Sequence, residues 1–154
     1  MSSCIFCDIL DGLEEASFVH RDELVSAFMD TRPINTGHVL VVPNLHHPYL
    51  CDLPREAGER MFTVARAVAS GLRRSGLECE GINLFVADGE TAMQEVLHCH
   101  IHVIPRYSGD GFRLRFGAHY HFVRPARWEL DAAAERVRCA LPDLPWIRSS
   151  DPAR

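Results

Sequence analysis

Three histidines alternate along one short segment, and this pattern is the part of the sequence best suited to do chemistry. Residues 94–106 read Gln-Glu-Val-Leu-His-Cys-His-Ile-His-Val-Ile-Pro-Arg. In a β-strand, alternate side chains share a face and lie about 6.6 Å apart, which places His98, His100 and His102 on one side. Imidazoles buried beside a sheet need hydrogen-bond partners or a ligand. The segment therefore predicts a functional site on one side of a strand.

Three interpretations of this histidine pattern remain open. The first is a solvated or core face with purely structural partners, although strict alternation of three histidines is improbable by chance. The second is a catalytic metal site, since alternating histidines can present two nitrogens to zinc and a third can complete an open site. The third, which we favour, is nucleophilic attack on phosphorus, because a neutral imidazole with a pKa of about 6.5 is a good nucleophile near pH 7. His100 is flanked by two imidazoles with which it would titrate as a coupled set.

Hydrophobic periodicity indicates the elements that must position these residues. Strands are expected at residues 17–20 and 24–29, which form a hairpin, and at 38–42, 81–87 and 98–104. A long helix is expected after Pro54, with apolar residues at three-and-four spacing as far as Leu72, and a final helix from about Arg127. The order of elements is strands, a long helix, more strands and a last helix, and strands and helices do not alternate as in βαβ units. This order predicts an α+β fold with an antiparallel sheet.

Length and composition indicate one ordinary globular domain. A chain of 154 residues can bury roughly 70% of its extended surface around one core. We expect the domain to span 1–141, with a loosely ordered tail at 142–154, where prolines and serines gather. We also expect a cytoplasmic location and reduced thiols, because neither a signal peptide nor an apolar run of about 18 residues is present. The net charge of −5 offers no general attraction for nucleic acid, so neither nucleic acid nor a membrane is an expected partner.

Several further motifs resemble the histidine-triad (HIT) family of nucleotide hydrolases and transferases, in the family's order over residues 4–106. They are Cys-Ile-Phe-Cys-Asp-Ile at 4–9, Ala-Phe-Met-Asp at 27–30, Gly-His-Val-Leu-Val-Val-Pro at 37–43, Gly-Ile-Asn at 81–83 and the histidine segment itself. The resemblance implies the HIT-like fold, a five-stranded antiparallel sheet with a long helix and a C-terminal helix. It also implies a homodimer that extends the sheet, joined through the long helix and the fifth strand.

The resemblance assigns roles to single residues. The catalytic positions that it implies are His100, His102, His38 and Gln94. The nucleotide-binding positions are Phe6, Ile9, Phe28, Asp30 and Asn83. Among these, His100 corresponds to the nucleophile and Asp30 to the residue that holds the ribose. Two positions depart from the family pattern: Ala87 stands where Asn or Gln usually contacts the phosphates, and Met93 stands where a small residue usually precedes the glutamine. Both departures leave recognition of the leaving group open.

A cysteine pair near the start of the chain is a weak signal by itself, and two interpretations stay open, a metal site, which we favour, and inert reduced thiols. Cys4 and Cys7 form a Cys-x-x-Cys motif, which also serves redox chemistry, but that use expects a βαβ context that the sequence lacks. In the bacterial family members that this sequence resembles, His46 and His98 complete a tetrahedral site for structural zinc, and His47 is the neighbouring alternative. A zinc ligand at His98 would lock the strand that carries the nucleophile. No metal is required for the chemical step itself.

The expected reaction is attack on a nucleotide α-phosphate through a covalent nucleotidyl-histidine intermediate. A polyphosphate leaving group departs as a stable anion, whereas an amine must be protonated as it leaves. The sequence identifies no dedicated acid, so dinucleoside polyphosphates or other adenylylated compounds, with a purine nucleotide, are the favoured substrates. The alternatives are hydrolysis of purine nucleoside phosphoramidates and a zinc-stabilised nucleotide-binding regulator with low turnover.

Overall fold

The computed structural model describes residues 4–117, 120 and 124–142. They belong to two units, one ending at Phe112 and one beginning at Arg113. The single domain over 1–141 stays a prediction. All of the expected tail except residue 142 lies outside the described residues.

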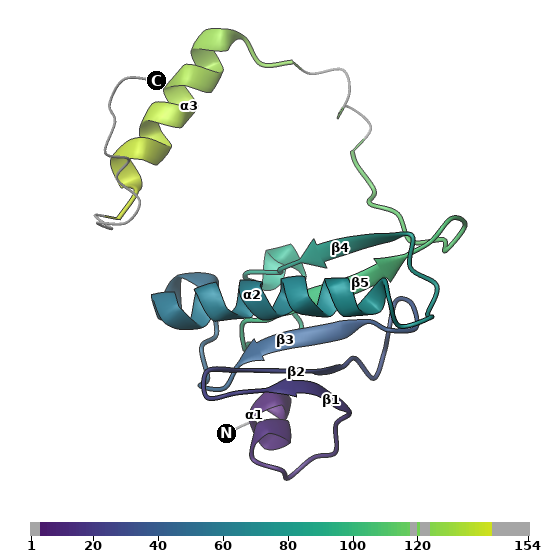
Figure 1. The fold of residues 1–154 in the computed structure, drawn as a ribbon. Helices are drawn as coiled ribbons and strands as arrows, with labels where there is room; N and C mark the ends of the chain where they lie inside the picture. The colour runs from purple at the N-terminus through teal and green to yellow at the C-terminus, as the bar shows by residue number, and fades with distance from the viewer. Residues whose placement is uncertain (1–3, 118–119, 121–123, 143–154) are drawn as a thin grey trace. The chain divides into compact units, whose positions relative to one another are not determined.

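The first unit is built on a five-stranded antiparallel sheet (Figure 1). Its strands are β1 (Phe18–Arg21), β2 (Val25–Met29), β3 (Val39–Pro43), β4 (Gly81–Phe85) and β5 (Ile101–Arg106). Their order across the sheet is β1-β2-β3-β5-β4. β5, the last of these strands in the sequence, therefore lies between β3 and β4 and pairs with both. The predicted α+β fold with an antiparallel sheet is confirmed.

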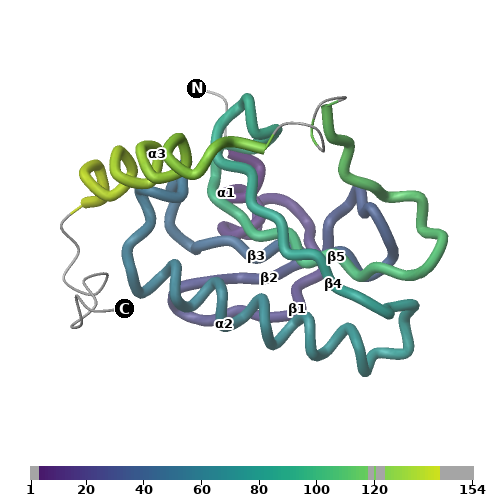
Figure 2. The backbone as a smooth tube through the Cα atoms, turned by 90° about the horizontal axis from the view of Figure 1, so that it is seen from above, coloured from purple at the N-terminus to yellow at the C-terminus, as the bar shows by residue number. Residues whose placement is uncertain are grey.

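Two helices cover opposite faces of this sheet (Figure 2). They are α1 (Ile5–Leu10) and α2 (Arg55–Leu72), and short 3-10 turns lie at Leu50–Asp52 and Glu90–Ala92. The helix α2 begins directly after Pro54, as predicted, because the fixed φ of proline suits the entry to a helix. The second unit contains α3 (Arg127–Ala140), which begins at the predicted residue. None of the helices in the described part of the chain has the length and apolar character needed to cross a membrane.

Alternate residues of the central strands enter two different cores. Val39 and Val41 of β3 pack in one cluster with Met61 of α2. Leu40, between them, packs on the other face with Phe6 of α1. Side chains alternate across a strand, so β3, which is buried along its whole length, is apolar on both sides. The face covered by α1 is the face that carries the histidines.

Two features of the fold differ from the sequence-based expectations. The helix α1 is not predicted, because a six-residue helix with only Phe6 and Ile9 buried is too short to show periodicity. The last strand begins at Ile101 and not at residue 98, because the Cys99 N–H donates to the carbonyl of His47 and not to a neighbouring strand.

The expectation that two sheets join through the fifth strand is wrong for this structure. β5 lies between β3 and β4 and is hydrogen-bonded on both sides. Among the described residues, β1 and β4 are the strands at the edges of the sheet. A strand whose backbone groups are already paired cannot accept a further strand. The homodimer itself stays a prediction.

Candidate active site and metal centre

The three histidines of the alternating segment lie on the α1 side of the sheet. The ring centroids of His100 and His102 are 4.7 Å apart. The ring of Phe6 meets His98 and His100 edge to face, with centroid separations of 5.8 and 5.2 Å. His98 and His100 are buried and precede β5, whereas His102 is half-buried within it. The common side agrees with the predicted alternation, although only one of the three residues is in a regular strand.

The His100 ring is held so that one nitrogen stays available. Its Nδ1 lies 2.7 Å from the carbonyl oxygen of His98. Because a carbonyl can only accept a hydrogen bond, Nδ1 carries the hydrogen and Nε2 keeps its lone pair. Burial lowers the pKa of His100, which favours the neutral ring at pH 7. None of its hydrogen bonds to the described residues uses Nε2, so this atom has the electronic form of a nucleophile.

A second imidazole pair lies next to this ring. His38 Nε2 and His102 Nδ1 are 2.9 Å apart. The Ile34 N–H donates to His38 Nδ1 at 3.2 Å, so neutral His38 carries its hydrogen on Nε2 and donates it to His102. Neutral His102 then carries its own hydrogen on Nε2. Burial, together with the neighbouring His100 and His38, lowers the pKa of His102 to about 4.

Asp30 supplies the negative charge nearest this pair. It directly follows β2, and its Oδ2 lies 3.5 Å from His38 Nδ1. Its Oδ1 accepts a hydrogen bond from the Arg32 N–H at 2.8 Å. The structure thus brings together three predicted site residues, Asp30, His38 and His102, that lie up to 72 positions apart in the sequence.

The predicted base-pocket residues form one apolar cluster. Phe6, Ile9 and Phe28 pack together with Leu40 and Val42 between α1 and the sheet. The rings of Phe6 and Phe28 meet edge to face at 5.6 Å. Because Phe6 also touches His100, this cluster forms one wall of the histidine site.

Gln94 and Asn83 have other partners in this structure. The buried Gln94 amide accepts a hydrogen bond from the Gly89 N–H at 2.8 Å and donates one to the Pro48 carbonyl at 2.7 Å, so it joins two loops. One amide hydrogen of Gln94 is left for another acceptor. Asn83 is exposed on β4 and accepts a hydrogen bond from the Arg106 guanidinium. Its predicted role in nucleotide binding stays a prediction.

The two departures from the family pattern differ in their surroundings. Ala87 is 3% exposed, so its methyl group fills buried space and offers no hydrogen bond. Met93 is 72% exposed, and its backbone has a positive φ of 69°. A non-glycine residue with φ above zero is uncommon.

Sequence reasoning missed a polar network that holds the loop carrying Asp30 and His38. Arg106 Nε and Asp110 Oδ2 are 2.5 Å apart, and the Asp110 side chain is almost fully buried. Asn35 donates from Nδ2 to Asp110 Oδ2 at 2.9 Å and to the Pro105 carbonyl at 2.8 Å. The only available signal was an acid four residues after Arg106, and nothing in the sequence indicates Asn35.

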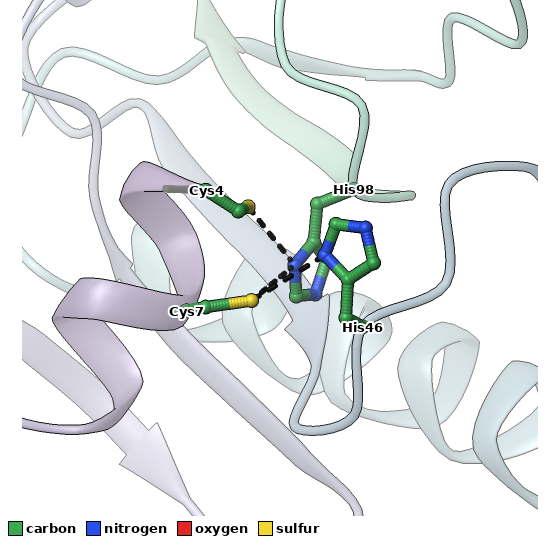
Figure 3. A group of neighbouring side chains, drawn as sticks. All are labelled: Cys4, Cys7, His46 and His98. Carbon is green, nitrogen blue, oxygen red and sulfur yellow. Dashed lines mark hydrogen bonds between the residues drawn. The ribbon is translucent and has the colours of Figure 1, made fainter. Parts of the chain in front are cut away.

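Four sulfur and nitrogen donors meet beside the histidine site (Figure 3). They are Cys4 and Cys7 at the start of α1, His46 in the loop after β3 and His98 before β5. Their ligand atoms all lie within 4.8 Å of one another. Cys7 Sγ is 3.4 Å from His46 Nδ1, and Cys4 Sγ is 3.5 Å from His98 Nδ1. We call this group the cysteine–histidine cluster; it contains His46 and not His47.

The chemistry of these donors fits a zinc ion. His98 donates from Nε2 to the Pro43 carbonyl at 2.9 Å, which leaves the Nδ1 lone pair facing the thiols. Burial lowers the pKa of His98 to about 4, so its ring is neutral at pH 7. Burial and the neighbouring Cys4 raise the pKa of the Cys7 thiol to about 11, so this thiol keeps its proton until a metal displaces it. Two sulfurs and two nitrogens form a common zinc donor set.

Comparison with known proteins agrees with this site. The HIT domain family model matches residues 12–109. An uncharacterized HIT-like protein of Borreliella burgdorferi is 39% identical over 118 residues, which cover 76% of this chain and 85% of that protein. The adenylylsulfatase HINT3 of Arabidopsis thaliana is 26% identical over 151 residues, which cover 97% of this chain and 76% of that protein.

Two solved structures extend the similarity to the fold. A HIT family protein from Bacillus anthracis superposes with a TM-score of 0.82 at 32% identity, covering 92% of this chain and 99% of that one. A zinc-bound histidine triad family protein from Mycobacterium smegmatis has a TM-score of 0.69 at 36% identity, covering 90% and 98% of the two chains. The family match over most of the first unit and these shared identities show that this chain belongs to the HIT family.

Proposed function

We propose that the protein is a nucleotide hydrolase or transferase in which His100 Nε2 attacks the α-phosphate. A bond forms between Nε2 and phosphorus while the bond from phosphorus to the leaving oxygen breaks, and that oxygen keeps the electron pair. Water or another hydroxyl acceptor then attacks phosphorus and loses a proton to solvent, while the electron pair of the phosphorus–nitrogen bond returns to Nε2. The observation that carries this proposal is the hydrogen bond from His100 Nδ1 to the His98 carbonyl, which leaves Nε2 unprotonated.

The neighbouring groups support a nucleotide as the substrate. His102, whose Nδ1 accepts from His38, is left with an Nε2 hydrogen that can donate to a phosphate oxygen. Asp30, with its carboxylate beside this pair, is positioned to accept hydrogen bonds from ribose hydroxyls. The apolar cluster around Phe6 offers a surface for the base. Each of these roles follows the family pattern that the sequence resembles.

An anionic leaving group fits these histidines better than an amine. A histidine with a pKa of about 4, such as His102, is in the doubly protonated, cationic form in only a small fraction of molecules at pH 7. An amine leaving from a phosphoramidate needs that proton, whereas a phosphate, sulfate or polyphosphate leaves as a stable anion. The similarity to a protein named an adenylylsulfatase supports the same choice. We therefore favour dinucleoside polyphosphates and other adenylylated compounds over phosphoramidates.

A metal in the cysteine–histidine cluster would have a structural role in this proposal. When bound, zinc supplies a cross-link between α1, the loop after β3 and the segment before β5. His98 belongs to the cluster, and its carbonyl oxygen holds the His100 ring. Fixing His98 therefore fixes the orientation of the nucleophile, and no step of the reaction passes through the metal.

We further propose a cytoplasmic homodimer. The edge strand β4 exposes Leu84, and the following Val86 and Phe62 of α2 are also exposed. Exposed apolar side chains next to an unpaired strand edge favour pairing with a second copy. Light scattering on the purified chain tests the dimer: a single mass of one protomer at micromolar concentration would contradict it.

A low-turnover nucleotide-binding regulator is the second candidate, favoured by one observation. The buried methyl group of Ala87 cannot hydrogen-bond a phosphate where the family usually has an amide. Weaker contacts to the leaving group would lower turnover more than nucleotide affinity.

A trapping experiment separates these functions. The protein is mixed with diadenosine tetraphosphate or adenosine 5′-phosphosulfate, denatured at alkaline pH and digested, and peptides are searched for AMP attached to His100. We expect the adduct in the unchanged protein and its loss in His100→Ala, with turnover reduced by several orders of magnitude and AMP affinity retained. His20→Gln is the matched control, because the His20 ring hydrogen-bonds Asp22, a carboxylate that Arg60 also binds, and neither partner belongs to the triad site. Bound nucleotide without any adduct or turnover would favour the regulator.

A further inference from the structure

A second group of possible metal donors lies apart from the cysteine–histidine cluster. One carboxylate oxygen of Asp30 and one ring nitrogen each of His38 and His102 lie within 4.8 Å of one another. They come from the residue after β2, the residue before β3 and the second residue of β5. His38 is buried, whereas Asp30 and His102 are half-buried and can be reached from solvent.

The two histidines are in the form that binds a metal. Only a neutral imidazole has a lone pair to donate, and burial lowers the pKa of both His38 and His102. His38 Nε2 and His102 Nδ1 point at each other across 2.9 Å. Two nitrogens bound to one tetrahedral metal at about 2.0–2.1 Å lie roughly 3.3 Å apart. To admit an ion, the two nitrogens need to separate by a few tenths of an ångström, and both rings must tilt so that their lone pairs converge on the ion and no longer face each other.

The hydrogen between the rings has a place to go. When a cation takes the His38 Nε2 lone pair, the hydrogen moves to Nδ1, and Asp30 Oδ2 lies 3.5 Å from that nitrogen. A metal-bound histidine that donates its other N–H to a carboxylate is a common arrangement. The Ile34 N–H then loses its acceptor, and the metal–nitrogen bond must outweigh this loss. No proton leaves the site, and the Asp30 charge partly neutralises the cation.

We propose that Asp30, His38 and His102 form a second metal site, which takes a divalent first-row cation such as Zn²⁺ or Co²⁺ and excludes the nucleotide while it is bound. His38 Nε2 and His102 Nδ1 are the protein ligands, Asp30 accepts from His38 Nδ1, and water completes the coordination. With fewer protein ligands and no thiolate, this site is weaker than the cysteine–histidine cluster. The competition with nucleotide rests on the proposed function, in which Asp30 and His102 contact the substrate.

Cobalt titration of the metal-free full chain tests this site. Thiolate-to-cobalt charge transfer marks the first equivalent at the cysteine–histidine cluster, and we expect a second, weaker equivalent without that absorption, measured by calorimetry. Cys7→Ser should weaken the charge-transfer band, because only the Cys4 thiolate remains, and should leave the weaker equivalent unchanged. His38→Gln should weaken that equivalent at least tenfold and leave the band, which also reports that the variant is folded. His20→Gln is again the matched control, because it removes a histidine that contacts an aspartate, His20 Nε2 to Asp22 Oδ2 at 2.8 Å, outside the site.

The outcomes are separable. A single equivalent in the unchanged protein overturns the second site, as does a second equivalent that survives both His38→Gln and His102→Gln unaltered. AMP should raise the apparent dissociation constant of the second equivalent at least tenfold and leave the first unchanged; no effect of AMP overturns the competition. Because cobalt binding needs no turnover, the second equivalent can be present even if no nucleotidyl-histidine forms, which would reject the enzymatic proposal alone.

Discussion

Replacing Gly37 with alanine should destabilise the protein more than the same change at a glycine with open surroundings. Gly37 has a φ of +98° and delivers the next residue, His38, to the site. A Cβ added there would lie 2.9 Å from Leu77 Cδ1, 3.0 Å from Leu72 Cδ2 and 3.4 Å from Pro105 Cγ. Gly76 has a similar φ of +83°, and no atom of the described residues lies within 4 Å of an added Cβ, which makes it the matched control.

The structure separates two contributions to the free energy of unfolding. Both variants place a side chain on a left-handed backbone, which costs about 1–2 kcal/mol. Only Gly37→Ala adds a steric clash. Leu77 is partly exposed and can move, but Leu72 is 7% exposed and packed in the core, so overpacking adds about 1–3 kcal/mol. We expect a loss of about 1–2 kcal/mol for Gly76→Ala and about 2–5 kcal/mol for Gly37→Ala.

Urea unfolding measures this difference. Both variants are unfolded at the same saturating zinc concentration, because bound metal stabilises the native state and its contribution must be equal in the two measurements. The two midpoints should differ with similar slopes. If Gly37→Ala loses no more stability than Gly76→Ala, the close approach of Gly37 to Leu72 does not matter energetically, and the reasoning from the added Cβ is refuted.

Three further predictions concern pH, metal and thiols. The pKa values of His98 and His102 are about 4 in the folded protein and about 6.5 in the unfolded chain, so the unfolded chain binds protons first as the pH falls. The urea midpoint of the metal-free protein should therefore fall between about pH 6.5 and about pH 4. A midpoint that does not change over this range would contradict the prediction. A chelator should lower activity and melting temperature together, as followed by calorimetry and turnover; lost activity at an unchanged melting temperature would indicate a catalytic metal instead. Cys51 and Cys139 are exposed and should react quickly with a thiol reagent, whereas Cys99 is buried with a pKa raised to about 11 by burial and should react only on unfolding; mass spectrometry of labelled peptides would expose rapid labelling of Cys99 as a failure.

Local patterns in the sequence account for much of the fold. The hairpin of β1 and β2, the strand β3 and the start of α2 after Pro54 lie within a residue or two of their predicted positions. Each is specified by neighbouring residues, through alternation, helical spacing or a proline at the entry. The short helix α1 escaped prediction because six residues hold too little periodic signal.

The candidate site divides in the same way. Residue type and spacing, which are local, determined that three imidazoles share one side of a segment and that Cys4 and Cys7 offer two thiols together. The tertiary structure alone decided which distant groups meet them: His38 bonded to His102 across 64 positions, Asn35 bonded to Asp110 across 75, and His46 chosen beside Cys7 in place of His47. It also decided that β4, not β5, has the free edge. Such contacts depend on how the strands are ordered across the sheet, and strand order is set by packing over the whole unit, which no short stretch of sequence encodes.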